Sequence, residues 1–275
     1  MEEIDDMRQI NEAQRKYYEQ ADGTATSEAN NFLTNAYRQL RGAAYDVLQS
    51  IEVDRTIRER HRSWLPSDLS GQTVLDLGAG TGTELSVELA RRSGDYVATD
   101  LSSSSLDVLQ EKLEEAGVSD YTRIQGDFLD PDFPKTGYDV VYAHSVMHHF
   151  RHLDPFLDIL SERMNAGGVV LTRDPLQTWG LYRLFRVLYR PFQADSAWEY
   201  PFTRSSLATI RDHFHVDRVQ GVVGRSKWGL PLALFDTQWA RQVAKRGHER
   251  DLKEATSLDD ITHCLQVAMR LVPRV

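Results

Sequence analysis

The stretch Val74–Gly82, VLDLGAGTG, decides the fold that we predict for this chain. An apolar run ends in closely spaced glycines, and an amphipathic segment over residues 83–92 follows directly. This order is typical of a buried strand that enters a tight turn and then a helix. Glycine has no Cβ and accepts a positive φ, so the backbone of such a turn can approach a ligand closely. The stretch therefore predicts a ligand-binding turn at the end of a strand.

The same alternation of strands and helices continues along the chain. We expect strands over residues 73–77, 96–99, 121–125, 138–143, 168–172 and 216–223. Helical patterns separate them, one opening with a capping box at Ser104 and another capped by Asp154. Strands that alternate with helices predict a parallel sheet covered on both faces, the doubly wound α/β class. Its ligand site is expected at the carboxyl ends of the strands.

Acidic residues at the ends of three successive predicted strands indicate the ligand. Thr83 stands where a dinucleotide-binding turn would have its third glycine, and Asp76 would repel a pyrophosphate. A carboxylate there suits S-adenosylmethionine (SAM), which carries an ammonium and a sulfonium. Asp100, at the end of the next strand, can accept hydrogen bonds from ribose hydroxyls. Asp127 and Phe128 follow the third strand and suit the amino group and ring face of adenine.

The composition limits the partners of the protein. A formal net charge of -9 disfavours nucleic acid, because contacts to a phosphate backbone need dense lysine and arginine. The single cysteine, Cys264, excludes an internal disulfide and a cysteine-rich metal site. The first twenty residues are charged throughout, and no window approaches the ~20 apolar residues that span a bilayer. We therefore expect a cytoplasmic protein without stable membrane insertion.

With these motifs, the sequence resembles the class I, Rossmann-like, SAM-dependent methyltransferases of the small-molecule type. Specific motifs cover residues 70–175, and the likeness continues loosely to residue 224. The resemblance implies a seven-stranded, mostly parallel sheet whose last strand is antiparallel, so we assign the C-terminal alternation over residues 265–271 to a strand. It also implies SAM as cofactor, S-adenosylhomocysteine (SAH) as product, and a set of cofactor-binding residues. This set is Tyr18, Asp76, Gly78, Ala79, Gly80, Asp100, Leu101, Asp127, Phe128 and His144.

Helical additions are expected around the SAM-binding core. The predicted parts are an N-terminal helical extension over 1–69, the SAM-binding core over 70–175, a lid insertion over 176–203, and the remainder of the core over 204–275 with a helical insertion at 225–262. Tyr18 resembles an N-terminal aromatic residue that closes over SAM in some members, with ordinary core packing as the alternative. Residues 181–190 form an amphipathic, basic pattern that fits a lid better than a membrane-surface helix.

Methyl transfer from a sulfonium is an in-line displacement that depends mainly on alignment and the exclusion of water. His144 follows the tip of the fourth strand, where the methyl donor is expected, and is the first candidate for a base or a substrate orienter. His148, in the next turn, is a second catalytic candidate, although the family commonly carries histidine there for structural reasons. Asp174 ends the fifth strand and either orients a substrate hydroxyl or amine, or caps the turn.

Motifs that the sequence lacks narrow the reaction. Residues 143–146 read AHSV, without the Asn/Asp-Pro-Pro-Tyr of amino-methylating members or the acids of metal-dependent catechol enzymes. We predict a biosynthetic, metal-independent enzyme that methylates an O, N or C nucleophile of a small, partly apolar or aromatic metabolite. A SAM-binding cyclase or rearrangement catalyst of the same fold is the alternative, and a binding module without chemistry is less favoured. A homo-oligomer is compatible with the sequence.

Overall fold

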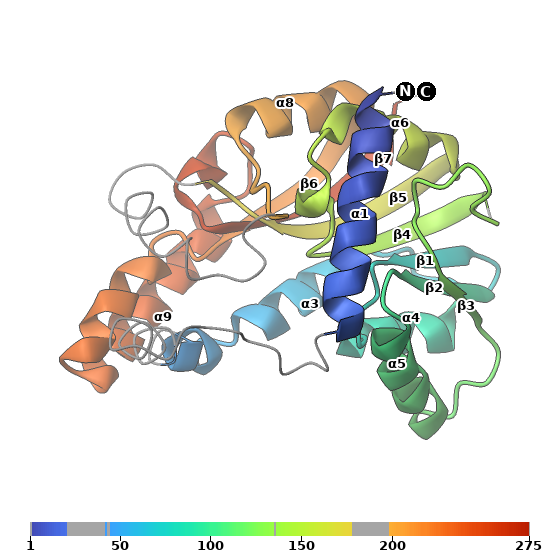
Figure 1. Ribbon diagram of the computed structural model, residues 1–275. Coiled ribbons are helices and arrows are strands. Elements are labelled where there is room, and N and C mark those ends of the chain that lie inside the picture. The colour runs from blue at the N-terminus through green and yellow to red at the C-terminus, as the bar shows by residue number, and fades with distance from the viewer. Residues whose placement is uncertain (1, 21–41, 43–44, 135, 178–197, 275) are drawn as a thin grey trace.

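The computed structural model describes residues 2–20, 42, 45–134, 136–177 and 198–274. Within these ranges a seven-stranded sheet runs in the order β3-β2-β1-β4-β5-β7-β6 (Figure 1). Strands β1 to β5 pair in parallel, whereas β7 is antiparallel to both β5 and β6. The predicted doubly wound sheet with an antiparallel last strand is thus confirmed. The strands are β1 (Thr73–Leu77), β2 (Asp95–Asp100), β3 (Thr122–Gln125), β4 (Tyr138–His144), β5 (Met164–Pro175), β6 (Phe214–Val222) and β7 (Gln266–Pro273).

Helices cover both faces of the sheet, and the alternation of side chains along β1 divides its residues between them. Leu75 and Leu77 pack with α6 and α8 on one face, whereas Val74 packs with α4 and α5 on the other. Every residue of β1 after Thr73 is buried, as expected for a parallel strand covered on both sides. The covering helices are α4 (Glu84–Arg92), α5 (Ser103–Glu115), α6 (Leu153–Glu162) and α8 (Arg204–His213).

Two predicted helix caps are wrong. The cap of α5 is Ser102 and not Ser104. Ser102 is the first serine after the end of β2, and its hydroxyl accepts from the backbone N–H of Ser105 (3.2 Å). The helix that contains Asp154 begins earlier, with His152 as its cap. Asp154 therefore lies in the first turn, where a carboxylate still interacts favourably with the helix dipole.

An N-terminal helix lies against the loop that follows β3. In Figure 1 this helix, α1, crosses the view from α6 toward α5. Arg8 donates to the carbonyl of Leu129 (Nη2–O 2.6 Å), and Met7 is buried in the same core as Phe128. A second helix, α3, precedes the sheet and contacts β7. The two helices are α1 (Glu2–Gln20) and α3 (Val53–Trp64).

Parts of the predicted helical additions lie outside the described residues. These are residues 21–41 and 43–44 of the expected N-terminal extension, and 178–197 of the expected lid. The side chain of Tyr18 is also outside the description, so its contact with the cofactor stays a prediction. None of the described helices is long and apolar enough to cross a membrane.

The chain between β6 and β7 folds into a helical unit at the edge of the sheet opposite β3 (Figure 1). Helix α9 crosses the preceding helical turns closely, because Gly247 has no side chain: a Cβ there would lie 2.5 Å from the backbone nitrogen of Ser226. Asp251 of α9 is buried and accepts from the backbone N–H groups of Gly224 (2.9 Å) and Arg225 (2.8 Å). The elements are η3 (Ser226–Leu234), α9 (Thr237–Glu254) and η4 (Asp260–His263).

The close crossing at Gly247 predicts the effect of adding one methyl group. Glycine to alanine in a helix normally stabilises a protein, but the Cβ of Gly247→Ala would displace backbone atoms of η3. We expect the free energy of unfolding to fall by about 1–3 kcal/mol in urea titrations, the usual cost of overpacking. Gln242→Ala, at an exposed position of the same helix, is the control and should change little. Unchanged stability of Gly247→Ala would contradict the close packing.

Candidate functional site

The turn after β1 has the backbone geometry that its glycines allow. Gly78 and Gly80 have φ values of 61° and 53°, in the left-handed region that favours glycine. A Cβ on Gly78 would lie 2.6 Å from Cγ2 of Val146, so this position has no room for a side chain. The N–H of Gly80 donates to Oδ2 of Asp100 (2.8 Å), which ties the turn to the end of β2. The turn is therefore held against both neighbouring strands.

A cavity of about 240 Å³ lies over this turn, at the carboxyl ends of β1 to β4. Asp100 and Asp127 line it, from the ends of β2 and β3. Asp127 accepts from the side-chain amide of Asn11 in α1 (2.9 Å) and from the N–H of Leu129 (2.9 Å). The sequence-predicted residues that line the cavity are Gly78, Gly80, Asp100, Leu101, Asp127 and Phe128.

Burial affects the pKa of both carboxyl groups in this cavity. It raises the pKa of Asp100, and backbone N–H groups of Ser102 and Gly80 partly offset this by donating to the carboxylate. Burial also raises the pKa of Asp127, and the hydrogen bond from the N–H of Leu129 partly offsets this rise. Two acidic groups with little access to water suit a ligand that brings hydroxyl and amino donors, and that carries positive charge.

Two further polar groups of the cavity wall have no partner among the described residues. The amide nitrogen of Gln14 and the hydroxyl of Thr99 are both buried, and neither makes a hydrogen bond there. Buried polar groups are rarely left unpaired, so these two indicate a polar ligand. With Asp100 for ribose hydroxyls and Asp127 for an adenine amino group, the donor and acceptor set fits SAM.

Some residues predicted to bind the cofactor lie elsewhere. Asp76 is buried beneath the turn and accepts from the hydroxyl of Tyr96 (2.7 Å), and its burial raises its pKa to about 6. Ala79 donates its backbone N–H to the carbonyl of Thr99 (2.9 Å). His144 lines a second cavity of about 360 Å³. Of the described residues, neither Asp76 nor Ala79 lines the first cavity.

The second cavity adjoins the first, because Ser145 lines both. It lies between α3, the start of α4, and the ends of β4 and β5. Ser145 itself has a φ of 61°, a conformation that costs a residue with a side chain ~1–2 kcal/mol. Its N–H donates to the carbonyl of Arg173 (2.8 Å), which holds this turn against β5. Non-glycine residues in this conformation often mark functional sites.

A line of hydrogen bonds fixes His144 in the second cavity. Tyr142 Oη lies 2.8 Å from Nδ1 of His144, and Nη1 of Arg173 lies 3.5 Å from Nε2. A guanidinium can only donate, so Nε2 accepts, and the proton of the neutral ring sits on Nδ1. Burial, together with Arg173, lowers the pKa of His144 to about 4. The ring is therefore neutral at physiological pH.

His61 of α3 is a second neutral histidine in this cavity. Its Nε2 lies 3.1 Å from the carbonyl oxygen of Thr172, so this nitrogen carries the proton. Nδ1 is buried and has no partner among the described residues. Complete burial lowers the pKa of His61 to about 3, with a smaller contribution from His144.

The other two residues predicted to be catalytic form a buried pair. Oδ1 of Asp174 accepts from the backbone N–H (3.1 Å) and from Nδ1 (2.9 Å) of His148, while Thr172 donates its hydroxyl to Oδ2. The pair joins the end of β5 to the short helix η1 (Met147–His149). Neither residue is among the described residues that line the two cavities. Next to the pair, His149 does line the first cavity.

The comparisons with known proteins agree with this geometry. Residues 75–170 match a family described as a methyltransferase domain. This part of the chain is therefore similar to the methyltransferase domain, and the sheet has the class I methyltransferase fold. The strand order and the antiparallel β7 described above are those of this family.

Proteins similar to this chain act on different small molecules, according to their names. The chain is 32% identical to magnesium-protoporphyrin O-methyltransferase of Rhodobacter capsulatus, over 50% of this chain and 64% of that protein, which is less than two thirds of its length. It is 27% identical to fatty-acid O-methyltransferase of Mycolicibacterium smegmatis, over 90% of this chain and 87% of that one. The crystal structure of geranyl diphosphate C-methyltransferase from Streptomyces coelicolor shares the fold, with a TM-score of 0.57, 15% identity and coverage of 81% and 80%.

Several residues of the candidate site were not predicted. Asn11 and Gln14 reach the first cavity from α1, and their spacing along one buried face is a signal that the sequence offered. Ser145 and Arg173 had no such signal. The position of Ser145 depends on a turn conformation, and that of Arg173 depends on the pairing of β5 with β4 and β7.

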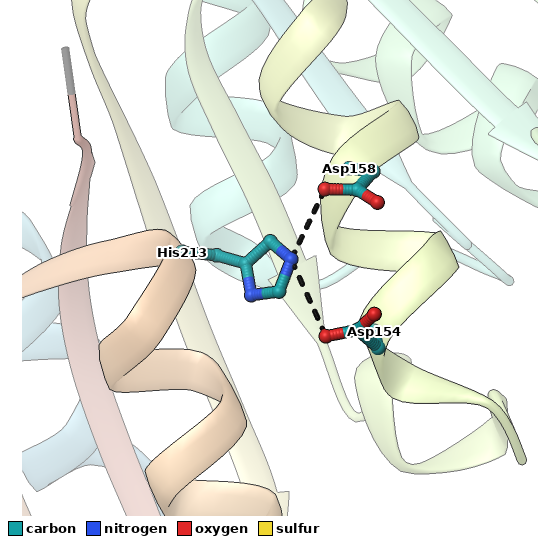
Figure 2. A group of neighbouring side chains, drawn as sticks. All are labelled: Asp154, Asp158 and His213. Carbon is teal, nitrogen blue, oxygen red and sulfur yellow. Dashed lines mark hydrogen bonds and ion pairs between the residues drawn. The ribbon is translucent and has the colours of Figure 1, made fainter.

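A separate cluster of possible metal ligands lies on α6 and α8. Figure 2 shows Nε2 of His213 between the carboxylates of Asp158 (3.1 Å) and Asp154 (3.5 Å). Both carboxylates are exposed, and Nδ1 of His213 is hydrogen-bonded to the carbonyl of Thr209 (3.0 Å). The three residues line neither of the two cavities. We interpret them as ion pairs that join the two helices.

The buried, neutral His61 predicts a loss of stability in acid. The unfolded chain takes up a proton on this ring near pH 6.5, but the folded protein only near pH 3. Stability should therefore fall by about 1.4 kcal/mol for each pH unit below ~6.5. His61→Gln removes this contribution, so its urea-unfolding free energy should depend less on pH between about 6.5 and 5. His215→Gln, at an exposed position, is the control. Equal slopes for His61→Gln and the unsubstituted protein would refute the interpretation.

Proposed function

We propose that this protein is a SAM-dependent methyltransferase that acts on a small molecule. The observation that carries the proposal is the first cavity, where a glycine turn and two buried carboxylates meet at the ends of parallel strands. Gln14 and Thr99 in its wall each have a buried polar atom without a partner in the described part of the chain, which supports a ligand with several polar groups. The match of residues 75–170 to a methyltransferase domain supports the same function.

Different residues of the first cavity hold different parts of the cofactor in this proposal. SAM, when bound, supplies an activated methyl group on its sulfonium. Asp100 is placed to accept from the ribose hydroxyls, while its own position is fixed by Gly80 and Ser102. Asp127, oriented by Asn11, is placed to accept from the adenine amino group. Both carboxylates also attract a positively charged cofactor more than its neutral product, which assists product release.

The predicted catalytic residues take different roles in this proposal. His144 is neutral and hydrogen-bonded at both nitrogens, which favours an orienting role over that of a base. His148 and Asp174 act as positioning residues, because their pair fixes the turn that carries Ser145 and His149. Alignment and exclusion of water are the main requirements of transfer from a sulfonium, so we propose a reaction without a metal.

The acceptor is proposed to be a small, partly apolar or aromatic metabolite. The relatives named above are O-methyltransferases of a magnesium porphyrin and of fatty acids, both with large apolar surfaces. The negative net charge of the chain supports a small-molecule acceptor over a nucleic acid.

Calorimetric titration with SAM and SAH tests the cofactor site. Asp100→Asn keeps the shape of the side chain but removes its charge, so we expect SAM affinity to fall by about 1.5–3 kcal/mol, roughly tenfold to a hundredfold. SAH, which lacks the sulfonium charge, should lose less. Asp120→Asn, on an exposed loop, is the matched control. Failure of the unsubstituted protein to bind either ligand would overturn the proposed function.

The product distinguishes methyl transfer from the alternative reaction of the fold. A methyltransferase forms one SAH for each acceptor consumed, whereas a SAM-binding cyclase converts its substrate without forming SAH. Mass spectrometry of the reaction mixture measures both quantities. Turnover of substrate without SAH would favour the cyclase.

A further inference from the structure

The second cavity is built differently from the first. The cations that line it are Arg173 and Arg58, and the anions are Asp54 and Glu84. Burial keeps His144 and His61 neutral, so they add hydrogen-bonding groups but no charge. The cations are also less exposed than the anions: 11% for Arg173 against 71% for Asp54, and 25% for Arg58 against 76% for Glu84. The inner part of the cavity is therefore positive.

The guanidinium of Arg173 contacts other residues of this cavity through all three of its nitrogens. Nε and Nη2 donate to Oε1 of Gln266 in β7 (3.1 and 2.7 Å), which fixes the plane of the group. Nη1 donates toward Nε2 of His144 and forms an ion pair with Oδ1 of Asp54 (2.6 Å). A guanidinium held rigidly in this way is prepared to bind a carboxylate.

Asp54 has the properties of a replaceable partner. It lies in the first turn of α3, and its side chain is largely exposed, so it can turn into water at little cost. The Arg173 guanidinium would then need another anion, because it is nearly buried. The ion pair with Asp54 shows that a carboxylate fits this position beside Arg173.

We propose that the second cavity binds the methyl acceptor and that Arg173 holds a carboxylate of this acceptor in the place of Asp54. The inference rests on the proposed function, because Ser145 joins this cavity to the proposed SAM cavity. Nδ1 of His61 is buried in the wall and has no partner among the described residues, which independently indicates a ligand with a polar group. The acceptor class is thus a carboxylic acid, and the apolar part of the molecule extends away from Arg173.

Binding of simple acids in the presence of saturating SAH tests this inference by calorimetry. The compounds are octanoate and benzoate, with octanamide and benzamide as uncharged matches and octyl phosphate as a second anion. We expect at least one acid to bind, with its amide weaker by about tenfold or more. Arg173→Gln should weaken the acid by a similar factor, and Arg173→Lys by less. Asp54→Asn should strengthen binding of the acid, because it removes the competing carboxylate.

Controls separate this inference from the proposed function. Glu59→Gln changes an exposed carboxylate of the same helix that pairs with Arg55 and does not line the cavity, so acid binding should not change. Each variant must still bind SAH. If Arg173→Gln no longer binds SAH, the acid affinity of Asp54→Asn alone tests the carboxylate site. Loss of SAH binding in the unsubstituted protein contradicts the proposed function itself.

With SAH bound, four outcomes overturn the carboxylate site alone. They are no binding of either acid at millimolar concentration, equal binding of acid and amide, no gain of affinity in Asp54→Asn, and a preference for octyl phosphate over octanoate. In the last case the cavity would be a phosphate site.

Discussion

The structure depends on how closely the turn after β1 approaches its neighbours. Gly78 lies so near Val146 that a methyl group would not fit, and Gly80 donates its N–H to Asp100. These two contacts set the positions of the ends of β1, β2 and β4 relative to one another. The cavity between them is therefore a product of backbone packing, and hydrogen bonds from backbone N–H groups orient its carboxylates. Such preorganisation reduces the entropy lost on binding.

The side chains that line the two cavities give them opposite electrostatic character. The first has two carboxylates with poor access to water, whereas the second has a nearly buried guanidinium and two histidines that burial keeps neutral. A cationic donor and an anionic acceptor would each find the cavity of complementary charge. The charges of the two reactants would then help to place them in the correct order along the sheet edge.

Much of the fold follows from local sequence pattern, whereas much of the second cavity does not. The predicted run 73–77 coincides with β1, and the C-terminal alternation forms β7, because burial on both faces or one face leaves a clear pattern. The capping serine of α5 was misassigned because several adjacent serines compete for one role. Arg173 could not be recognised, since its function depends on Gln266 from a distant strand and on Asp54 from a helix before the core. Contacts between segments that are distant in the sequence produce no regular residue spacing from which they could be predicted.

The two cavities share a single residue, Ser145, among those that the structure describes. The first is lined from the glycine turn, α1 and the ends of β2 to β4, and the second from α3, the start of α4 and the ends of β4, β5 and β7. With the second cavity as the proposed acceptor site, mutations in α3, β5 and β7 can reshape it without changing the residues of the first. After gene duplication, a chain of this design can diverge toward new acceptors while it keeps the same methyl donor. Only Ser145, strained and common to both walls, would constrain the two at once.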